Sequence, residues 1–266
     1  MFLTIDGRKA YAYTGGKTFD AALPTVALVH GAQHDHSVWV LQSRYLAHHG
    51  YSVLAVDLPG HGRSAGPALE SVEAMAQWVL AVLAASGAAR ASIVGHSMGS
   101  LIALEAAGAA PLKVSGIALV GSANPMAVSD TLLEATRDDE ALAQDMVNIW
   151  SHSTYAAKPS NPGPGFWIVG QNLRLMQRIA PGVMHTDFKA CNAYAGGAAR
   201  AAQVRCPTLF VLGNRDAMTP PRAARDLQAA IKGQRTVLVS PCGHNLMAEQ
   251  PDAVLDALTG FLPSCT

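Results

Sequence analysis

The stretch Gly95-His96-Ser97-Met98-Gly99 decides the fold of this chain. The apolar run 91–94 before it predicts a buried strand, and the run 100–107 after it predicts a helix. A serine at such a junction, with a glycine two residues away on either side, predicts a sharp strand-to-helix turn. That turn presents the hydroxyl at a helix N-terminus. The glycines are needed because side chains there would collide with the neighbouring strand and helix.

The composition is that of a folded domain with a large core. The chain has 266 residues, of which 50% are hydrophobic and 14% are charged. Its length suits one large domain or one core domain that carries an insertion. Nineteen basic residues balance nineteen acidic ones, so we expect no nucleic-acid partner and no electrostatic attachment to a membrane.

The sequence also predicts a cytoplasmic protein. The apolar residues 1–5 run directly into Asp6-Gly7-Arg8 and are too short a stretch for a signal-peptide core, and no apolar stretch approaches the roughly 20 residues of a membrane helix. The four cysteines are widely spaced, and in a reducing compartment we expect free thiols at Cys191, Cys206, Cys242 and Cys265.

Apolar strands alternate with helical segments over most of the chain. Strands that are apolar on both faces belong in a parallel sheet covered by helices on both sides, which predicts a doubly wound, mostly parallel α/β fold. A hairpin at residues 2–5 and 10–14 precedes the other strands, expected at 25–29, 52–56, 91–94, 116–120, 208–212 and 236–239. The helical spacing between them covers 39–49, 71–85, 221–231 and 251–262.

One interval, from Val120 to Thr208, contains no convincing strand. It shows helical patterns at 130–151, 166–179 and 183–194, with a Pro- and Gly-rich linker at 158–165. We therefore predict a helical cap inserted after the sixth strand. The cap is assigned to residues 124–199, and the core to residues 1–123 and 200–266.

A serine hydroxyl needs a base to take its proton and an acid to orient that base. In open α/β sheets such partners lie just beyond the carboxyl ends of later strands. Asp216 follows the strand 208–212 and His244 follows the strand 236–239, which makes them the candidates. Two simpler interpretations stay open: Asp216 caps the helix that begins near Pro220, or His244 is a surface loop histidine.

An oxyanion needs two backbone N–H donors held in place before the reaction. One is expected from Met98, directly after the serine. The other is expected from Ala32, because Gly31 lets the chain approach the site closely. The alternative is that Gly31 belongs to an ordinary turn.

These motifs together resemble the α/β-hydrolase superfamily. The resemblance covers roughly residues 1–125 and 200–266, and its motifs are His30-Gly31, Trp39, Asp57–Ser64, Gly95–Gly99, Gly213–Pro220 and Gly243-His244. It implies Ser97 as nucleophile, Asp216 as acid and His244 as base, in the chain order that this fold uses. Asp57 and His61 are more often structural in that family, and the resemblance implies no cofactor.

The cap offers candidates for a substrate pocket, although most apolar residues of such helices simply form the core. The candidates are Gln33, His34, Trp150, Trp167 and Met176. His34, Asp35 and His36 also suggest a metal, but neighbouring positions on one loop rarely converge on an ion, so we expect none.

A capped pocket implies a small, largely apolar substrate, and the resemblance implies ester hydrolysis through an acyl-enzyme. Hydrolysis of a carbon–carbon bond in a diketone-type ring-fission product is the nearest rival. Thioester, lactone and amide cleavage also stay open, because the fold does not determine the substrate. A different class of function is a small-ligand receptor or binding module built on this fold.

Overall fold

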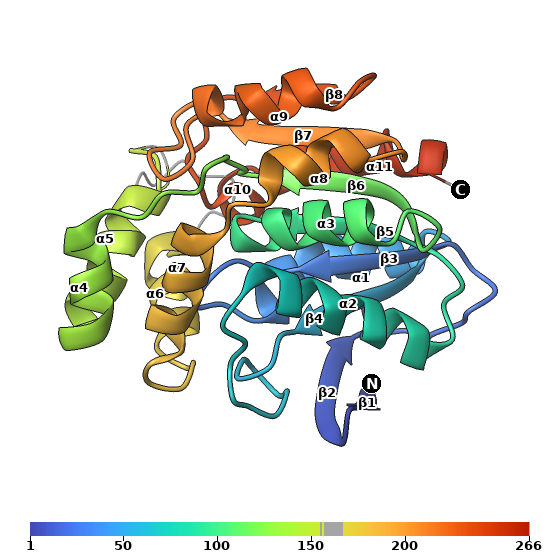
Figure 1. Cartoon of the computed structure of the whole chain (residues 1–266), viewed down its shortest axis with the longest axis horizontal. Helices are drawn as coiled ribbons and strands as arrows, with labels where there is room; N and C mark the ends of the chain where they lie inside the picture. The colour runs from blue at the N-terminus through green and yellow to red at the C-terminus, as the bar shows by residue number, and fades with distance from the viewer. Residues whose placement is uncertain (155, 157–166, 266) are drawn as a thin grey trace.

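The computed structural model describes residues 1–154, 156 and 167–265 and is built on an eight-stranded sheet (Figure 1). The strand order is β1-β2-β4-β3-β5-β6-β7-β8. β1 and β2 pair antiparallel to their neighbours, and the other strands are parallel. The bounds are β1 Phe2–Ile5, β2 Arg8–Tyr13, β3 Thr25–Val29, β4 Ser52–Asp57, β5 Ala91–His96, β6 Val114–Val120, β7 Thr208–Gly213 and β8 Arg235–Val239. The predicted mostly parallel sheet is confirmed.

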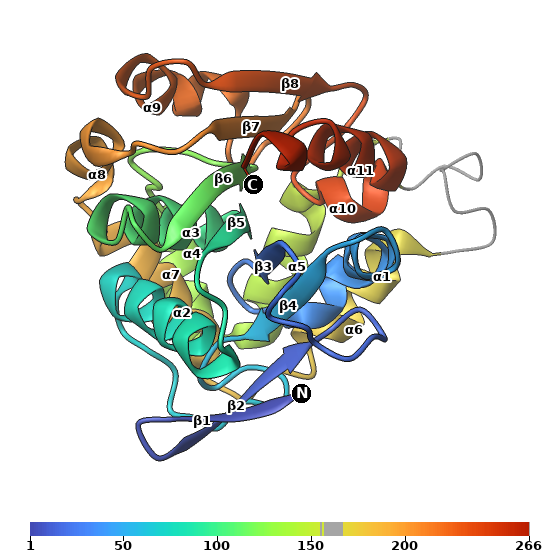
Figure 2. The ribbon, with the colours of Figure 1, turned by 90° about the vertical axis from the view of Figure 1, so that its right-hand side faces the viewer.

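Helices cover both faces of this sheet (Figure 2). One face packs against α1 (Val40–His48), α10 (Leu246–Glu249) and α11 (Pro251–Thr259). The other packs against α2 (Val72–Ser86), α3 (Met98–Ala109), α8 (Gly197–Gln203) and α9 (Arg225–Ala230). β3, β4 and β5 are buried along their whole length, as expected for strands that are apolar on both faces. Short 3-10 turns cover His36–Trp39, Pro221–Ala224 and Leu262–Cys265.

Four helices lie beyond the carboxyl ends of the parallel strands, between β6 and α8 (Figure 1). They are α4 (Asp130–Asp138), α5 (Glu140–Ser151), α6 (Ile168–Met176) and α7 (Val183–Ala193), and together they are called the insertion below. The insertion has a small apolar core of its own, formed by Leu132, Ala135, Ala143, Val147, Met176, Met184 and Phe188.

The structure corrects two expectations for this region. The single helical pattern at 130–151 is two helices, because Asp139 leaves the helical conformation and its side chain caps α5 by accepting from the Leu142 N–H. Helix α8, which the sequence did not predict, packs against α3. The linker at 158–165 and Phe166 lie outside the described residues.

The helices are short throughout. Within the described residues, none is both long and apolar enough to cross a membrane.

Candidate active site

Ser97 is the single residue between the end of β5 and the start of α3. Its backbone has φ 54° and ψ −118°, a conformation that L-residues rarely adopt outside functional turns. A Cβ on Gly95 would clash with the carbonyl oxygen of Gly99, and a Cβ on Gly99 would clash with the carbonyl oxygen of Val29 in β3. The two glycines therefore allow the turn because they leave room for its backbone.

Asp216 and His244 meet above the ends of β7 and β8. His244 Nδ1 lies 2.7 Å from Asp216 Oδ2, and both side chains are buried. A carboxylate only accepts, so Nδ1 carries the proton and Nε2 is left with a lone pair. Burial acts to raise the pKa of Asp216, but the His244 ring and the hydrogen bonds to the carboxylate outweigh it, and the pKa is lowered.

Asp216 does not cap the following helix, because the 3-10 turn Pro221–Ala224 has no side-chain hydrogen bond at its N-terminus. Its Oδ1 accepts the backbone N–H groups of Met218 and Thr219, at 2.8 and 2.7 Å, which fixes the turn. Its Oδ2 faces His244 and also accepts the Thr219 hydroxyl at 2.8 Å. The Thr219 hydroxyl lies 3.0 Å from His244 Nδ1, so it touches both partners.

The loop that carries His244 is held from two sides. His96, the residue before Ser97, donates from Nε2 to the carbonyl oxygen of His244 at 2.8 Å. The carbonyl of Ser151 at the end of α5 accepts the N–H groups of His244 and Asn245. Position 244 is therefore fixed by both β5 and the insertion.

Ser97 and His244 line the same cavity. No hydrogen bond joins their side chains within the part of the chain that the structure describes. In enzymes without substrate such hydrogen bonds are often long and tighten only in the reacting complex.

Ala32 and Met98, the predicted oxyanion donors, both lie beside Ser97. Met98 is the first residue of α3, so its N–H has no acceptor within the helix. Gly31 approaches so closely that a Cβ there would lie 3.2 Å from the Ser97 Cβ, and Ala32 lines the cavity beside it. Among the described residues neither N–H donates to another protein atom.

The loop after Ala32 is anchored to the insertion. Gln33 has φ 58° and donates its N–H to Asp187 Oδ2 of α7 at 2.8 Å. Asp187 also accepts from His61 Nε2 at 2.9 Å, so one buried carboxylate ties two loops of the core to α7.

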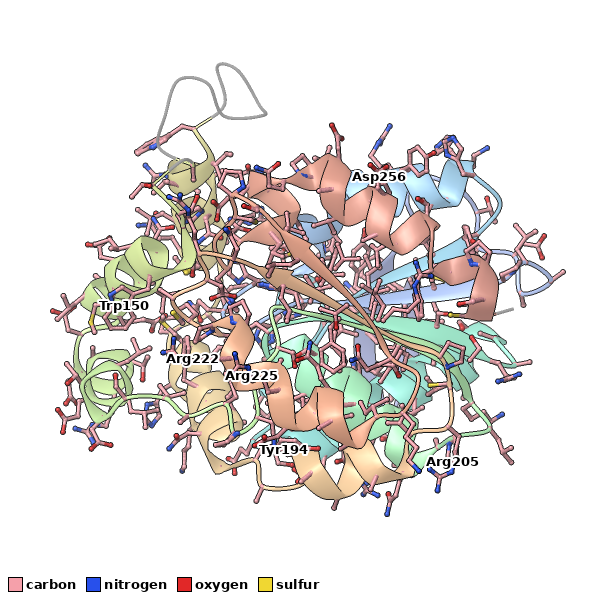
Figure 3. The ribbon with its side chains drawn as sticks, turned by 90° about the horizontal axis from the view of Figure 1, so that it is seen from above. Trp150, Tyr194, Arg205, Arg222, Arg225 and Asp256 are labelled. Carbon is pink, nitrogen blue, oxygen red and sulfur yellow. The ribbon has the colours of Figure 1, made fainter. Side chains whose placement is uncertain are left out.

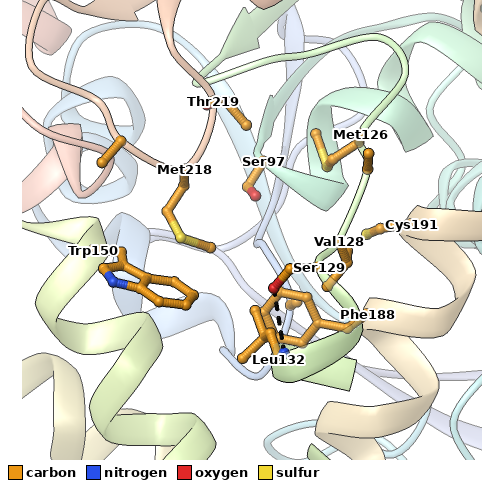
Figure 4. A pocket seen from close by; sticks show the side chains of 13 residues that line it. Ser97, Met126, Val128, Ser129, Leu132, Trp150, Phe188, Cys191, Met218 and Thr219 are labelled. Atoms are coloured by element: carbon orange, nitrogen blue, oxygen red, sulfur yellow. Dashed lines mark hydrogen bonds between the residues drawn. The ribbon is translucent and has the colours of Figure 1, made fainter. Parts of the chain in front are cut away.

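Two cavities open beside Ser97. The larger, of about 180 Å³, is mainly apolar, and the Ser97 side chain points toward it (Figure 4). Its side chains include Met126, Val128, Leu132, Trp150, Phe188 and Met218. The smaller, of about 30 Å³, is also lined mainly by apolar atoms, and its polar residues include His34, His244, Asn172 and Asn245.

The structure brings only two of the five predicted pocket residues to these cavities. Trp150, on α5, lines the larger one (Figures 3 and 4), and His34 lines the smaller. Gln33 is instead buried behind the loop, where its amide donates to Glu140 and to the Met176 carbonyl. Met176 belongs to the apolar core of the insertion, and Trp167 is 74% exposed.

Other residues of the site were not predicted from the sequence. Leu132 and Met126 follow β6 and carry no motif, and Asn172 lies in the middle of α6. Met218 and Thr219 lie two and three residues after Asp216, and this proximity was the one available signal.

Asp35, His36 and Asp57 bring possible ligand atoms within 4.8 Å of one another. These atoms are already bonded within the protein. Asp57 Oδ1 accepts from the N–H and Nδ1 of His36, and Asp35 Oδ1 accepts from the Ser37 N–H. The cluster fixes the loop that leads into the first 3-10 turn.

The class of protein follows from three features, namely the parallel sheet, the strained turn at Ser97 and the His244–Asp216 pair. A family model described as the alpha/beta hydrolase fold matches residues 24–251. The chain belongs to this family and is a hydrolase of the α/β fold, which confirms the resemblance seen in its motifs.

Particular relatives cover most of the chain. A protein of Klebsiella pneumoniae (strain 342), named as a carbamate hydrolase, RutD, is 30% identical over 254 residues. That alignment covers 90% of this chain and 93% of the relative. A pimeloyl-[acyl-carrier protein] methyl ester esterase of Nitrosomonas europaea is 29% identical over 237 residues, covering 83% of this chain and 88% of the esterase.

Solved structures share the fold at lower identity. The enol-lactonase from Burkholderia xenovorans LB400 has a TM-score of 0.87 at 22% identity and covers 99% of this chain and 100% of its own. An esterase from Exiguobacterium antarcticum has a TM-score of 0.86 at 21% identity, with 99% of both chains covered. At these identities the likeness shows the fold alone.

Proposed function

We propose that the protein is a serine hydrolase that cleaves a small, largely apolar ester, with Ser97 as nucleophile, His244 as base and Asp216 as the orienting acid. The observation that carries this proposal is the shared site. A serine in a strained turn lines the same cavity as a histidine whose Nδ1 is bonded to a buried carboxylate.

The chemistry follows from these positions. His244 Nε2 takes the Ser97 proton as Oγ attacks the ester carbonyl, and the oxyanion is held by the N–H groups of Ala32 and Met98. The protonated His244 then gives its proton to the departing alkoxide, which leaves an acyl group on Ser97. Water, deprotonated by His244, attacks the acyl-enzyme, and His244 returns that proton to Ser97 Oγ as the acid is released.

The insertion supports a small substrate. Its helices α4, α5 and α7 supply Leu132, Trp150 and Phe188 to the larger cavity, so it acts as a cap over Ser97. An apolar cavity of this kind favours an apolar acyl or aromatic group. One relative is named as a methyl ester esterase, which agrees with ester cleavage.

The test compares Ser97→Ala with the wild type on methyl heptanoate, with release of the acid as the readout. We expect kcat/KM to fall on the order of 10³-fold or more in the variant. A fluorophosphonate probe should label the wild type and the control Ser129→Ala, whose serine also lines the cavity, but not Ser97→Ala.

Two outcomes contradict the proposal. Equal hydrolysis by wild type and Ser97→Ala would show that the nucleophile is wrong. A folded wild type that neither turns over the ester nor reacts with the probe would favour a small-ligand binding module. A panel of thioesters, lactones, amides and vinylogous diketones then tests the other bonds.

A further inference from the structure

Ser97 lies at the boundary between two cavities of different size. Ala32, Phe188 and Met218 line both of them. The larger has about 180 Å³ and mainly apolar walls, whereas the smaller has about 30 Å³ and includes the His244 ring. A substrate whose carbonyl is at Ser97 therefore extends into two unequal spaces.

The position of His244 decides which part of the substrate enters which space. The base must return its proton to the oxygen of the leaving group, so that group has to lie on the side of the His244 ring. His244 lines the small cavity and not the large one. The alcohol portion is thereby directed into the small cavity and the acyl portion into the large one.

The size and charge of the small cavity restrict the alcohol. One water needs about 10–15 Å³, so this space holds about two water-sized groups. The described residues that line the two cavities include no lysine, arginine, aspartate or glutamate. Burial lowers the pKa of both His34 and His96 and favours their neutral forms. A charged group here would lose its hydration without gaining an ionic partner.

One wall of the small cavity is a pair of asparagines. Asn172 and Asn245 also line a third cavity of about 200 Å³, whose other residues include Leu41, Leu175 and Met247. The Asn172 side chain is fixed, since its Oδ1 lies 2.8 Å from His34 Nε2 and its Nδ2 donates to Asn148 Oδ1 at 3.0 Å. Asn245 Nδ2 lies 3.0 Å from His152 Nε2. The pair therefore separates the small cavity from a larger one.

We infer that the substrates are uncharged esters with a large apolar acyl group and a small alcohol of one or two carbons, and that Asn172 sets the limit on the alcohol. This inference rests on the proposed function, because it takes Ser97 and His244 as nucleophile and base.

Two isomeric esters test the division. Methyl heptanoate and hexyl acetate have the same molecular formula and similar reactivity. Their long chains lie on opposite sides of the ester group, in the acyl part of the first and in the alcohol part of the second. We expect kcat/KM to be higher for methyl heptanoate, on the order of tenfold or more. Equal values, or a preference for hexyl acetate, would overturn the inference.

Asn172→Ala tests the wall directly. Removing the amide joins the small cavity to the third one, so kcat/KM for hexyl acetate should rise by about tenfold while that for methyl heptanoate does not rise. Leu132→Ala, which enlarges only the acyl side, is the matched control and should give no such gain. Asn172→Ser serves as the second variant if the alanine variant does not fold. An unchanged ratio of the two esters in the folded variant would overturn the role of Asn172.

Ser97→Ala separates the two levels of the argument. If Ser97→Ala hydrolyses neither isomer, but the wild type has equal kcat/KM for the two esters, the proposed function stands and this inference falls. If Ser97→Ala hydrolyses both at the wild-type rate, the proposed function itself fails.

Discussion

The Thr219 hydroxyl is the polar group that touches both Asp216 and His244. It donates to Asp216 Oδ2 at 2.8 Å and lies 3.0 Å from His244 Nδ1. Its hydrogen bond is one of the causes of the lowered pKa of Asp216. In the proposed mechanism Thr219 is thus a positioning residue, which acts on the base His244 through the acid Asp216.

Thr219→Val keeps the shape of the side chain and removes the hydroxyl. We expect kcat to fall by about tenfold, with a smaller change in KM, since the His244 ring is held less well. Losing a donor to the ionised form should raise the pKa of the Asp216 carboxyl group, which an NMR titration measures. Thr136→Val, which removes a hydroxyl bonded elsewhere in the insertion, is the control. An unchanged kcat and an unchanged Asp216 pKa in Thr219→Val would contradict this role.

The candidate site was predictable from the sequence only in part. Ser97, Asp216 and His244 each follow an apolar strand, and the carboxyl ends of parallel strands meet at one edge of the sheet. Asn172 has no such marker. It lies inside α6, and the direction of its side chain depends on how the insertion packs against the loop around His34.

At the scale of elements, α7 holds the loop that carries Ala32. Asp187 on α7 accepts from the Gln33 N–H and from His61 Nε2, and all three groups are buried. Burial acts to lower the pKa of His61, but the Asp187 carboxylate and the hydrogen bonds to it and to Pro59 outweigh it, so the pKa is raised. The His61–Asp187 pair therefore stabilises the fold at low pH, and it also fixes the position of the loop that carries Ala32.

Asp187→Ala should lower the free energy of unfolding by about 3–5 kcal/mol, because it leaves a buried histidine and a buried N–H without their acceptor. A raised folded-state pKa means that the charge contribution is complete below the ordinary histidine pKa of 6.5. It is lost as the pH rises through the folded-state value. In urea titrations from pH 6 to 9, the difference in the free energy of unfolding between wild type and variant should become smaller as the pH rises.

A double variant checks that Asp187 and His61 act as a pair. His61→Gln combined with Asp187→Ala should cost less stability than the sum of the two single changes. Strictly additive costs would mean that each residue is stabilised by other neighbours.

The strands and helices were predicted better than the points at which a helix is interrupted or a loop turns. The five strands from β3 to β7 follow from short apolar runs, because burial on both faces leaves a strong pattern. The division between α4 and α5 depends on one residue, Asp139, that also fits within a helical pattern. The positive φ of Gln33 is set by its contacts with three helices of the insertion, which no local pattern encodes.

At the scale of the whole molecule, the insertion and the core meet at the loop of His244. Glu249 in α10 accepts from the Gly243 N–H at 3.1 Å and from the Ser153 hydroxyl and N–H. Ser153 follows α5, and Gly243 precedes His244. One buried carboxylate therefore joins the end of the insertion to the loop that carries the proposed base.

Glu249→Ala should lower both stability and activity, whereas a matched variant should lower stability alone. Glu105 is an equally buried glutamate that binds Tyr194 and Arg200, two turns along α3 from Ser97. Removing either carboxylate takes the acceptor away from a buried donor, the Gly243 N–H or the Tyr194 hydroxyl, so we expect each variant to lose roughly 1–3 kcal/mol of unfolding free energy. Only Glu249→Ala should also reduce kcat, by about tenfold, because only its loop positions His244. Urea unfolding and ester turnover measured on both variants decide the point. If Glu249→Ala keeps the wild-type kcat, the junction stabilises the fold but does not position the base.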